Sequence, residues 1–301
     1  MSWFWLTLIA AVFLGLYDIA KKNAVAQNAV PPVLLGNVCT AALIWGIPVL
    51  AAFANFDMGI EAKWQATLTD LEVEDHLLLF AKSAMVGSSW AFAFFALKHL
   101  PISIAAPIRA TSPFWTILLA VAFLSERPNQ LQWSGIVLIL MAFVAFSRVG
   151  EREGIRFHRN RWVAFMVIAT LISAFCGIYD KFLLQTKGYS AATVQAWFSI
   201  YLVPVMFPMF LYWWKYDRGK SPFEWRWSIP LIAIFLLLAD YCYFVAVSQP
   251  DALIAVISPL RRTSIIIAFA YGIFGLKEVN WRAKLVCIAI LFAGVCLISL
   301  A

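Results

Sequence analysis

The sequence has few charged residues for its length. Asp, Glu, Lys and Arg make up only 13% of the 301 positions, whereas hydrophobic residues make up 63%. The mean hydropathy is +0.83, and a water-soluble domain cannot cover its surface with that composition. The scarcity of charge therefore excludes a soluble globular protein. The formal charge of +7 requires no nucleic-acid partner, because basic loops beside anionic lipids account for it.

Residues that carry metal or catalytic chemistry are also scarce. The five cysteines lie inside apolar runs without the close pairing of a zinc or redox site, and three histidines are too few for a credible metal centre. The chain contains no phosphate-binding glycine loop, zinc-protease helix motif or serine elbow. We therefore predict that the protein is not an enzyme and uses no metal and no cofactor.

Long apolar runs fill most of the chain instead. A membrane-spanning helix needs about 20 apolar residues, because the hydrocarbon layer is about 30 Å thick and a helix rises about 1.5 Å per residue. Barrel strands would be short and alternating, so these runs predict an all-α polytopic membrane protein with ten transmembrane helices. The expected spans are residues 3–20, 31–54, 76–97, 101–124, 131–147, 162–185, 189–214, 228–247, 251–276 and 282–300.

The loop charges predict an orientation. If the N-terminus faces outward, most lysines and arginines, including Lys21 and Lys284, fall in cytoplasmic loops, and the other face holds only Lys63, Arg127, Lys181 and Lys187. Short cytoplasmic loops collect Lys and Arg. We therefore expect a multi-pass protein of the cell membrane with both termini extracytoplasmic.

The two halves of the chain resemble each other. Gly15-Leu16-Tyr17-Asp18 recurs as Gly177-Ile178-Tyr179-Asp180, and Pro107-Ile108-Arg109 recurs as Pro259-Leu260-Arg261, followed at the same distance by Glu126 and Glu278. This predicts two five-helix repeats, residues 1–150 and 151–301. Because five is odd, the second repeat must enter the membrane inverted, as in many alternating-access carriers.

One motif carries a resemblance to known proteins. It runs from Leu100-Pro101 through Pro107, Arg109 and Pro113 to Ser125-Glu126-Arg127 and Gln132-Trp133-Ser134-Gly135, with a looser second copy from Pro259 to Glu278. The pattern resembles the drug/metabolite transporter superfamily and, within it, the EamA-type transporters of ten spans. That resemblance implies a cavity lined by spans 1 to 4 and 6 to 9, with spans 5 and 10 at the periphery. It leaves the substrate open, because one scaffold serves many solutes.

Three arginines are the leading candidates for binding substrate. Arg109 and Arg261 lie about 12 Å and 14 Å along their spans, where a charge costs several kcal/mol unless it faces a wet cavity or a partner. Together with Arg262 they would form a cationic centre, and guanidinium forks match carboxylate and phosphate oxygens. Arg261-Arg262 is also similar to the dibasic pair of the triose-phosphate translocator branch. In the alternative, the arginines only pair with Asp18, Asp180, Asp240 or Asp251 and hold helices together.

Further candidates surround these arginines. Tyr17-Asp18 and Tyr179-Asp180 lie near span ends and can contact substrate or pair with adjacent lysines. Asp240-Tyr241 is more central, where an acid can be the counter-ion of Arg262 or carry a proton, and Trp90 can flank the cavity. We expect Lys82 to snorkel towards the membrane surface and the two span-end acids, Glu126 and Glu278, to be structural.

The leading functional hypothesis is a secondary transporter that moves a small anionic metabolite, with phosphate esters among the candidates, by alternating access. An exporter of amino acids or amphipathic drugs is the alternative. A membrane-embedded lipid-modifying enzyme or a structural membrane protein is disfavoured, since the sequence lacks paired acids or histidines at one membrane face. The expected partners are a small-molecule substrate and the lipid bilayer. A homodimer, the direction of transport and the coupling to protons or to an exchanged solute stay open.

Overall fold

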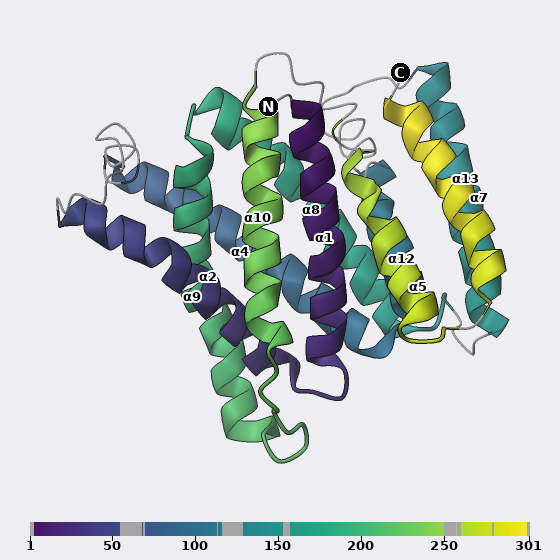
Figure 1. Cartoon of the computed structure of the whole chain (residues 1–301), viewed down its shortest axis with the longest axis horizontal. Coiled ribbons are helices and arrows are strands. Elements are labelled where there is room, and N and C mark those ends of the chain that lie inside the picture. Colours follow the sequence, from purple (N-terminus) through teal and green to yellow (C-terminus); the bar gives the residue numbers. More distant parts are fainter. Residues whose placement is uncertain are drawn as a thin grey trace.

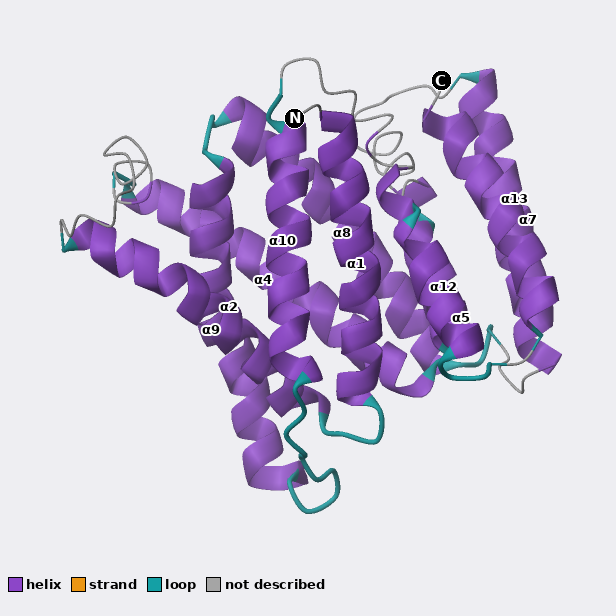
Figure 2. Ribbon diagram, viewed as in Figure 1, coloured by secondary structure: helices purple, strands orange, loops and turns teal. Residues whose placement is uncertain are grey.

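The computed structural model describes residues 3–54, 68, 70–112, 114–115, 129–152, 157–249, 257, 260–278 and 280–299. These residues form ten α-helices and two short π-helical segments, and no strand occurs among them (Figure 2). The all-α fold class is therefore confirmed. Of the sequence candidates, Glu126, Asp251 and Pro259 lie outside the described residues.

Eight of the described helices follow the expected spans to within about five residues, whereas the expected spans 101–124 and 251–276 are described only in part, as α5 (Ile102–Ala110) and α12 (Ser264–Phe274). In the first half the helices are α1 (Trp3–Val25), α2 (Val30–Phe53), α4 (Val73–His99), α5 (Ile102–Ala110) and α7 (Gln130–Arg152). In the second half they are α8 (Arg161–Lys181) with η1 (Phe182–Thr186), α9 (Ala191–Tyr212) with η2 (Trp213–Asp217), α10 (Ser228–Val247), α12 (Ser264–Phe274) and α13 (Trp281–Ser299). Seven helices in the described part are long and apolar enough to cross a membrane.

Local sequence explains where several helices begin. Glu72 and Asp75 form a reciprocal capping box at the start of α4, and the side chain of Ser190 accepts from Thr193 N at 3.0 Å before α9. The Asn160 side chain accepts from Trp162 N at 2.9 Å before α8. Such caps satisfy amide groups that have no partner within the first helical turn.

The helices pack in pairs that join the two halves. The most extensive pairs are α1 with α10, α4 with α8, α2 with α9, and α7 with α13, and α12 packs on α1 and α5. Figure 1 shows α7 and α13 side by side at one end of the bundle, as the resemblance implied for the fifth and tenth spans. Small residues permit the close crossings: a Cβ on Gly15 would lie 2.7 Å from Ile267 on α12.

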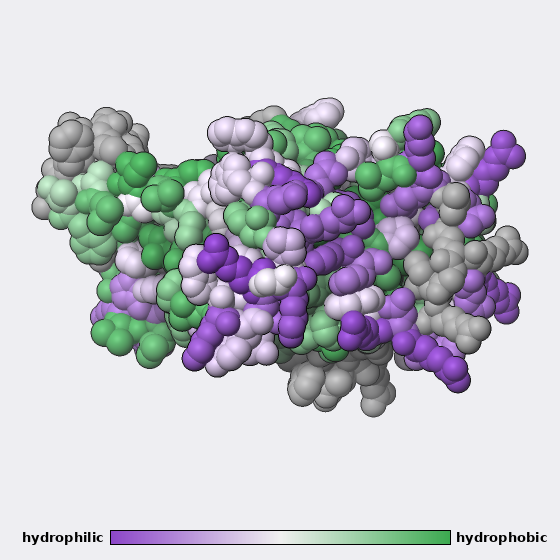
Figure 3. Space-filling view, turned by 90° about the horizontal axis from the view of Figure 1, so that it is seen from below, coloured by the Kyte–Doolittle hydropathy of each residue, from purple (hydrophilic) through white to green (hydrophobic). Residues whose placement is uncertain are grey.

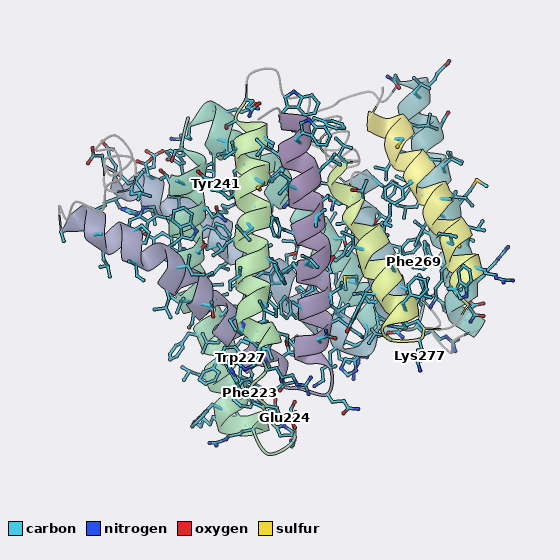
Figure 4. All side chains as sticks on the ribbon, in the orientation of Figure 1. Phe223, Glu224, Trp227, Tyr241, Phe269 and Lys277 are labelled. Atoms are coloured by element: carbon cyan, nitrogen blue, oxygen red, sulfur yellow. The ribbon has the colours of Figure 1, made fainter. Side chains whose placement is uncertain are left out.

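The two ends of the bundle differ. Helix α1 begins and α13 ends at the same edge, called here the termini edge (Figure 1). Phe223, Glu224 and Trp227 lie at the opposite edge (Figure 4). Seen from below, hydrophilic residues gather over the middle of that opposite face (Figure 3). Large apolar side chains are exposed elsewhere, for example Leu43 and Leu50 at 69% and 70%, as expected of helices that face lipid.

Two lysines that the charge count placed in loops are buried. Lys21 lies inside α1 and is 1% exposed, because this helix continues to Val25. Lys284 lies in the first turn of α13, is 1% exposed, and its Nζ donates to Ser103 Oγ at 2.8 Å. Their assignment to loops was wrong, since hydropathy alone cannot show which charged residues point into the protein.

Candidate substrate-binding site

A cavity of about 510 Å³ lies among α1, α4, α5, α8, α9 and α10, and Arg261 and Arg262 line it from the segment just before α12. It extends towards the termini edge, because Asp180 near the end of α8 and Val247 at the end of α10 belong to its lining. At the opposite edge, Lys22 Nζ donates to Leu97 O and Leu100 O at 2.8 and 2.6 Å. These bonds tie α1 to the end of α4 below the cavity.

Arg109 reaches the cavity from α5 and forms an ion pair with Asp18 on α1. The Asp18 carboxylate is 5% exposed and has a second cation nearby, since Lys21 Nζ lies 3.3 Å from the same oxygen. The ring of Tyr17 lies 5.9 Å from the guanidinium carbon of Arg109. One buried carboxylate therefore faces two buried or half-buried cations.

Arg261 and Asp240 form the second arginine pair. Arg261 Nη2 donates to Asp240 Oδ1 at 2.5 Å, and the Tyr243 ring centre lies 3.9 Å from the guanidinium carbon, within cation–π range. The expectation that Asp240 is the counter-ion of Arg262 is therefore wrong. Tyr243 was missed by the sequence reasoning, although it follows Asp240 by three positions and so shares its helix face.

Arg262 differs from the other two arginines. It lines the same cavity, yet it forms no ion pair with any residue that the structure describes. Its Nε is buried and has no hydrogen-bond partner. A cation in this position is available to a ligand.

Lys82 is buried, so the expectation that it would snorkel to the surface is wrong. It is 2% exposed, and its Nζ forms an ion pair with Asp180 across the contact of α4 and α8. The rings of Phe198 and Phe244 each lie 5.1 Å from Nζ. The signal that could have found this pair was a lone lysine in one apolar run and a lone aspartate in another.

Comparison with known proteins shows a match for the N-terminal half of the chain. Residues 1–148 match the EamA-like transporter family. The N-terminal half is EamA-like. A Sinorhizobium sp protein named "Uncharacterized transporter in cobO 3'region" is 28% identical over 138 residues, which cover 46% of this chain and 91% of the relative. A solved structure titled "Crystal structure of protein" has a TM-score of 0.62 at 16% identity, covering 97% of this chain and 95% of that chain, and this likeness concerns the fold alone. Together with the apolar helices, the EamA match over residues 1–148 indicates an integral membrane transporter.

The fold brings most, but not all, of the predicted site residues together. Arg109, Arg261, Arg262, Asp240, Asp180, Tyr17 and Trp90 line the cavity, and Asp18 adjoins it through Arg109. Tyr179 lies outside the lining and donates its hydroxyl to Leu78 O at 3.1 Å. Tyr241 also lies outside and is 38% exposed (Figure 4). Glu278 accepts from Ile102 N and Ser103 N at 2.9 and 3.1 Å, which caps α5 in the structural role expected of it.

The cations in and beside this cavity outnumber the carboxylates. Within the described residues the cations are Lys21, Lys82, Arg109, Arg261 and Arg262, and the carboxylates are Asp18, Asp180 and Asp240. The excess of two positive charges is concentrated near Arg262 and Asp18, because Lys82 and Arg261 each have a carboxylate of their own. The arrangement can bind an anion.

Proposed function

We propose that this EamA-type protein is a secondary transporter for a small anionic metabolite, with carboxylates and phosphate esters both within the class. The observation that carries the proposal is that, among the residues the structure describes, cations outnumber carboxylates around the cavity. An uncompensated charge inside a membrane protein costs several kcal/mol. A negatively charged substrate that binds Arg109 and Arg262 removes that cost, with Arg261 and its partner Asp240 beside it, and guanidinium groups bind its oxygens in pairs.

We infer that transport proceeds by alternating access of two inverted five-helix repeats, residues 1–150 and 151–301. The helix packing supports this: exchanging each helix for its counterpart in the other half turns the α1–α10 pair into α8–α4, and the α1–α12 pair into α8–α5, all of which occur. The length of the Sinorhizobium relative also supports a half-length repeat. Its alignment with this chain covers 91% of the relative but only 46% of this chain. Carriers of this kind expose a midplane site to each side in turn.

We infer that the protein lies in the cell membrane with both termini extracytoplasmic. Without Lys21 and Lys284, the remaining loop lysines and arginines still favour the same orientation. A fluorescent reporter that matures only in the cytoplasm should stay dark when fused after Ala301. Bright fluorescence from correctly inserted protein would reverse the orientation.

An exporter of amino acids or amphipathic drugs is the second candidate. The carboxylates of Asp180 and Asp240 line the cavity beside cations, and the rings of Trp90, Phe198 and Phe244 form part of its wall. A zwitterion needs both signs of charge, and an amphipathic solute needs aromatic surface. To pair with Asp180 or Asp240, the positive group of such a substrate must displace Lys82 or Arg261. An anion that binds Arg262 displaces neither cation.

A thermal-shift screen of the purified protein separates the two candidates. Ligands that bind the folded state raise its melting temperature by mass action. Phosphate esters or carboxylates should give the largest shift, exceeding those of amino acids and hydrophobic cations at equal concentration. The largest shift from amino acids would favour the exporter, and a response to hydrophobic cations alone would refute an anion site.

A further inference from the structure

A small side pocket of about 50 Å³ adjoins the main cavity at its deep end. The two spaces share Tyr17, Arg109 and Arg262 in their walls. The side pocket alone includes Lys21 and Ala93, each about one helical turn further from the termini edge than the shared residues of α1 and α4. It is therefore the innermost part of the space that a substrate can enter.

Positive charge dominates this side pocket. Its walls carry Lys21, Arg109 and Arg262, and the only described carboxylate paired with any of them is that of Asp18. Lys21 is 1% exposed, with its Nζ over the Tyr17 ring at 4.4 Å. Three cations thus converge on a space with one neighbouring anion, and a dry environment makes each charge strong.

The polar groups of the side pocket favour an acceptor rather than a donor. Ser89 Oγ and Thr170 Oγ1 donate their protons to Ala169 O and Met166 O at 2.8 and 2.7 Å. The donors that remain for a ligand are the three cations, the hydroxyls of Ser173 and Tyr17, and the indole N–H of Trp90. Charge-assisted donors around a ligand oxygen give the strongest hydrogen bonds available to a protein.

The size of the side pocket limits what can enter it. A volume of about 50 Å³ is only a few times the roughly 10 to 15 Å³ that one buried water needs. A carboxylate or a phosphate group fits, whereas a sugar or an aromatic ring does not. The adjoining main cavity of about 510 Å³, with Trp90, Phe198, Leu236 and Phe244 in its wall, has room for a larger and partly apolar body.

We propose that the side pocket is a head-group subsite that holds the carboxylate or phosphate of an organic anion, whose larger body lies in the main cavity, and that Lys21 is one of its ligands. This inference rests on the proposed transport of anions and narrows the substrate class to acids with one compact head group. The subsite also explains why a lysine is buried at position 21. Asp18 already has Arg109 as an ion-pair partner, so Lys21 is not needed to neutralise it.

The test measures binding of benzoate and phenyl phosphate to the full-length protein in nanodiscs, by calorimetry, with benzyl alcohol as the uncharged control. The two anions separate a carboxylate head from a phosphate head. Lys21→Met should weaken binding of the preferred anion about 10-fold to 150-fold, the loss expected for one charge-assisted contact. Lys22→Met removes the same charge from the next residue, which lies outside the pocket lining, and should change affinity less than about threefold.

A second variant guards against a folding defect in Lys21→Met. Ala93→Leu fills the side pocket without changing any charge and should also weaken binding of the anion. If Lys21→Met and Ala93→Leu are folded and both bind benzoate or phenyl phosphate like the parent protein, the subsite is refuted while anion transport stands. If the parent protein binds neither anion and responds only to amino acids or cations, the subsite and the proposed function both fail.

Discussion

Asp18 and Asp180 occupy equivalent places in the repeated Gly-x-Tyr-Asp motif, but they have different partners. Asp18 pairs with Arg109 on α5 and has Lys21 on its own helix 3.3 Å away. Asp180 pairs with Lys82 on α4, while Arg261, the counterpart of Arg109, pairs with Asp240. The same motif is thus surrounded by balanced charge in the second half and by excess positive charge in the first.

This difference indicates which side of the cavity can receive an anion. Around Asp180 and Asp240 two acids meet two bases, so an incoming anion gains little. Around Asp18 the cations exceed the carboxylate, and Arg262 adds one more. Unequal surroundings of equivalent residues are also what the proposed alternating-access cycle requires, because the two repeats adopt different conformations in any one state.

The largest expected effect concerns the balanced side. Lys82→Met leaves the Asp180 carboxylate buried without its cation, and it should lower the free energy of unfolding by about 3 to 5 kcal/mol. Denaturant unfolding in detergent measures this loss. Replacing both partners, Lys82→Met with Asp180→Leu, should recover most of the stability. If Lys82→Met alone is as stable as the parent protein, the Lys82–Asp180 pair is not buried as described.

The two adjacent arginines should respond differently. Arg262→Gln removes a cation that forms no ion pair with a carboxylate among the described residues. Its melting temperature should therefore stay the same or rise, while its affinity for the anion falls about 10-fold to 150-fold. Arg261→Gln removes the partner of Asp240 and should lower the melting temperature as well. Equal melting losses in both variants, with affinity intact, would favour arginines that only hold helices together.

The equivalent glycines of the two motifs provide a comparison that is independent of charge. A Cβ on Gly15 would lie 2.7 Å from Ile267 Cβ, whereas a Cβ on Gly177 would meet nothing within 4 Å. Gly15→Ala should therefore cost about 1 to 3 kcal/mol of stability. Gly177→Ala should be neutral or stabilise by up to about 1 kcal/mol, because alanine favours the helix. Thermal unfolding of the two variants side by side would expose any error in the α1–α12 crossing.

The smallest effect is expected for two tyrosines of α10. Tyr243→Leu removes the ring beneath Arg261, a contact worth about 0.5 to 2 kcal/mol, and should weaken anion binding by that route. Tyr241→Leu alters an exposed side chain outside the cavity and should leave affinity unchanged. A binding defect confined to Tyr241→Leu would place the site on the other side of this helix.

The positions of the helices could be predicted from the sequence more accurately than which residues of each helix face the cavity. Residues 228–247 were expected as a span and form α10, because bilayer thickness sets the length of an apolar run. Asp240 and Tyr241 were grouped as site residues, yet consecutive positions point about 100° apart on a helix and only Asp240 faces the cavity. A closer use of helical periodicity would have selected Tyr243.

The ion pairs could not be predicted from the sequence. Lys21 and Lys82 resembled residues near a membrane surface, and only the packing of α1 with α10 and of α4 with α8 shows that they are buried. Which acid meets which base depends on helix rotation and depth, and a single sequence does not encode these in any local pattern. The excess of cations beside Asp18 therefore became visible only in the assembled structure.

The position of a bound anion tests the account most directly. Crystals grown with 4-bromobenzoate and measured at the bromine absorption edge would locate the ligand without assumptions about its density. The proposed head-group subsite predicts a bromine peak in the main cavity, with the carboxylate in hydrogen-bond reach of Lys21 and Arg262. A ligand bound beside Asp180 and Asp240, or bound only outside the cavity, would contradict it.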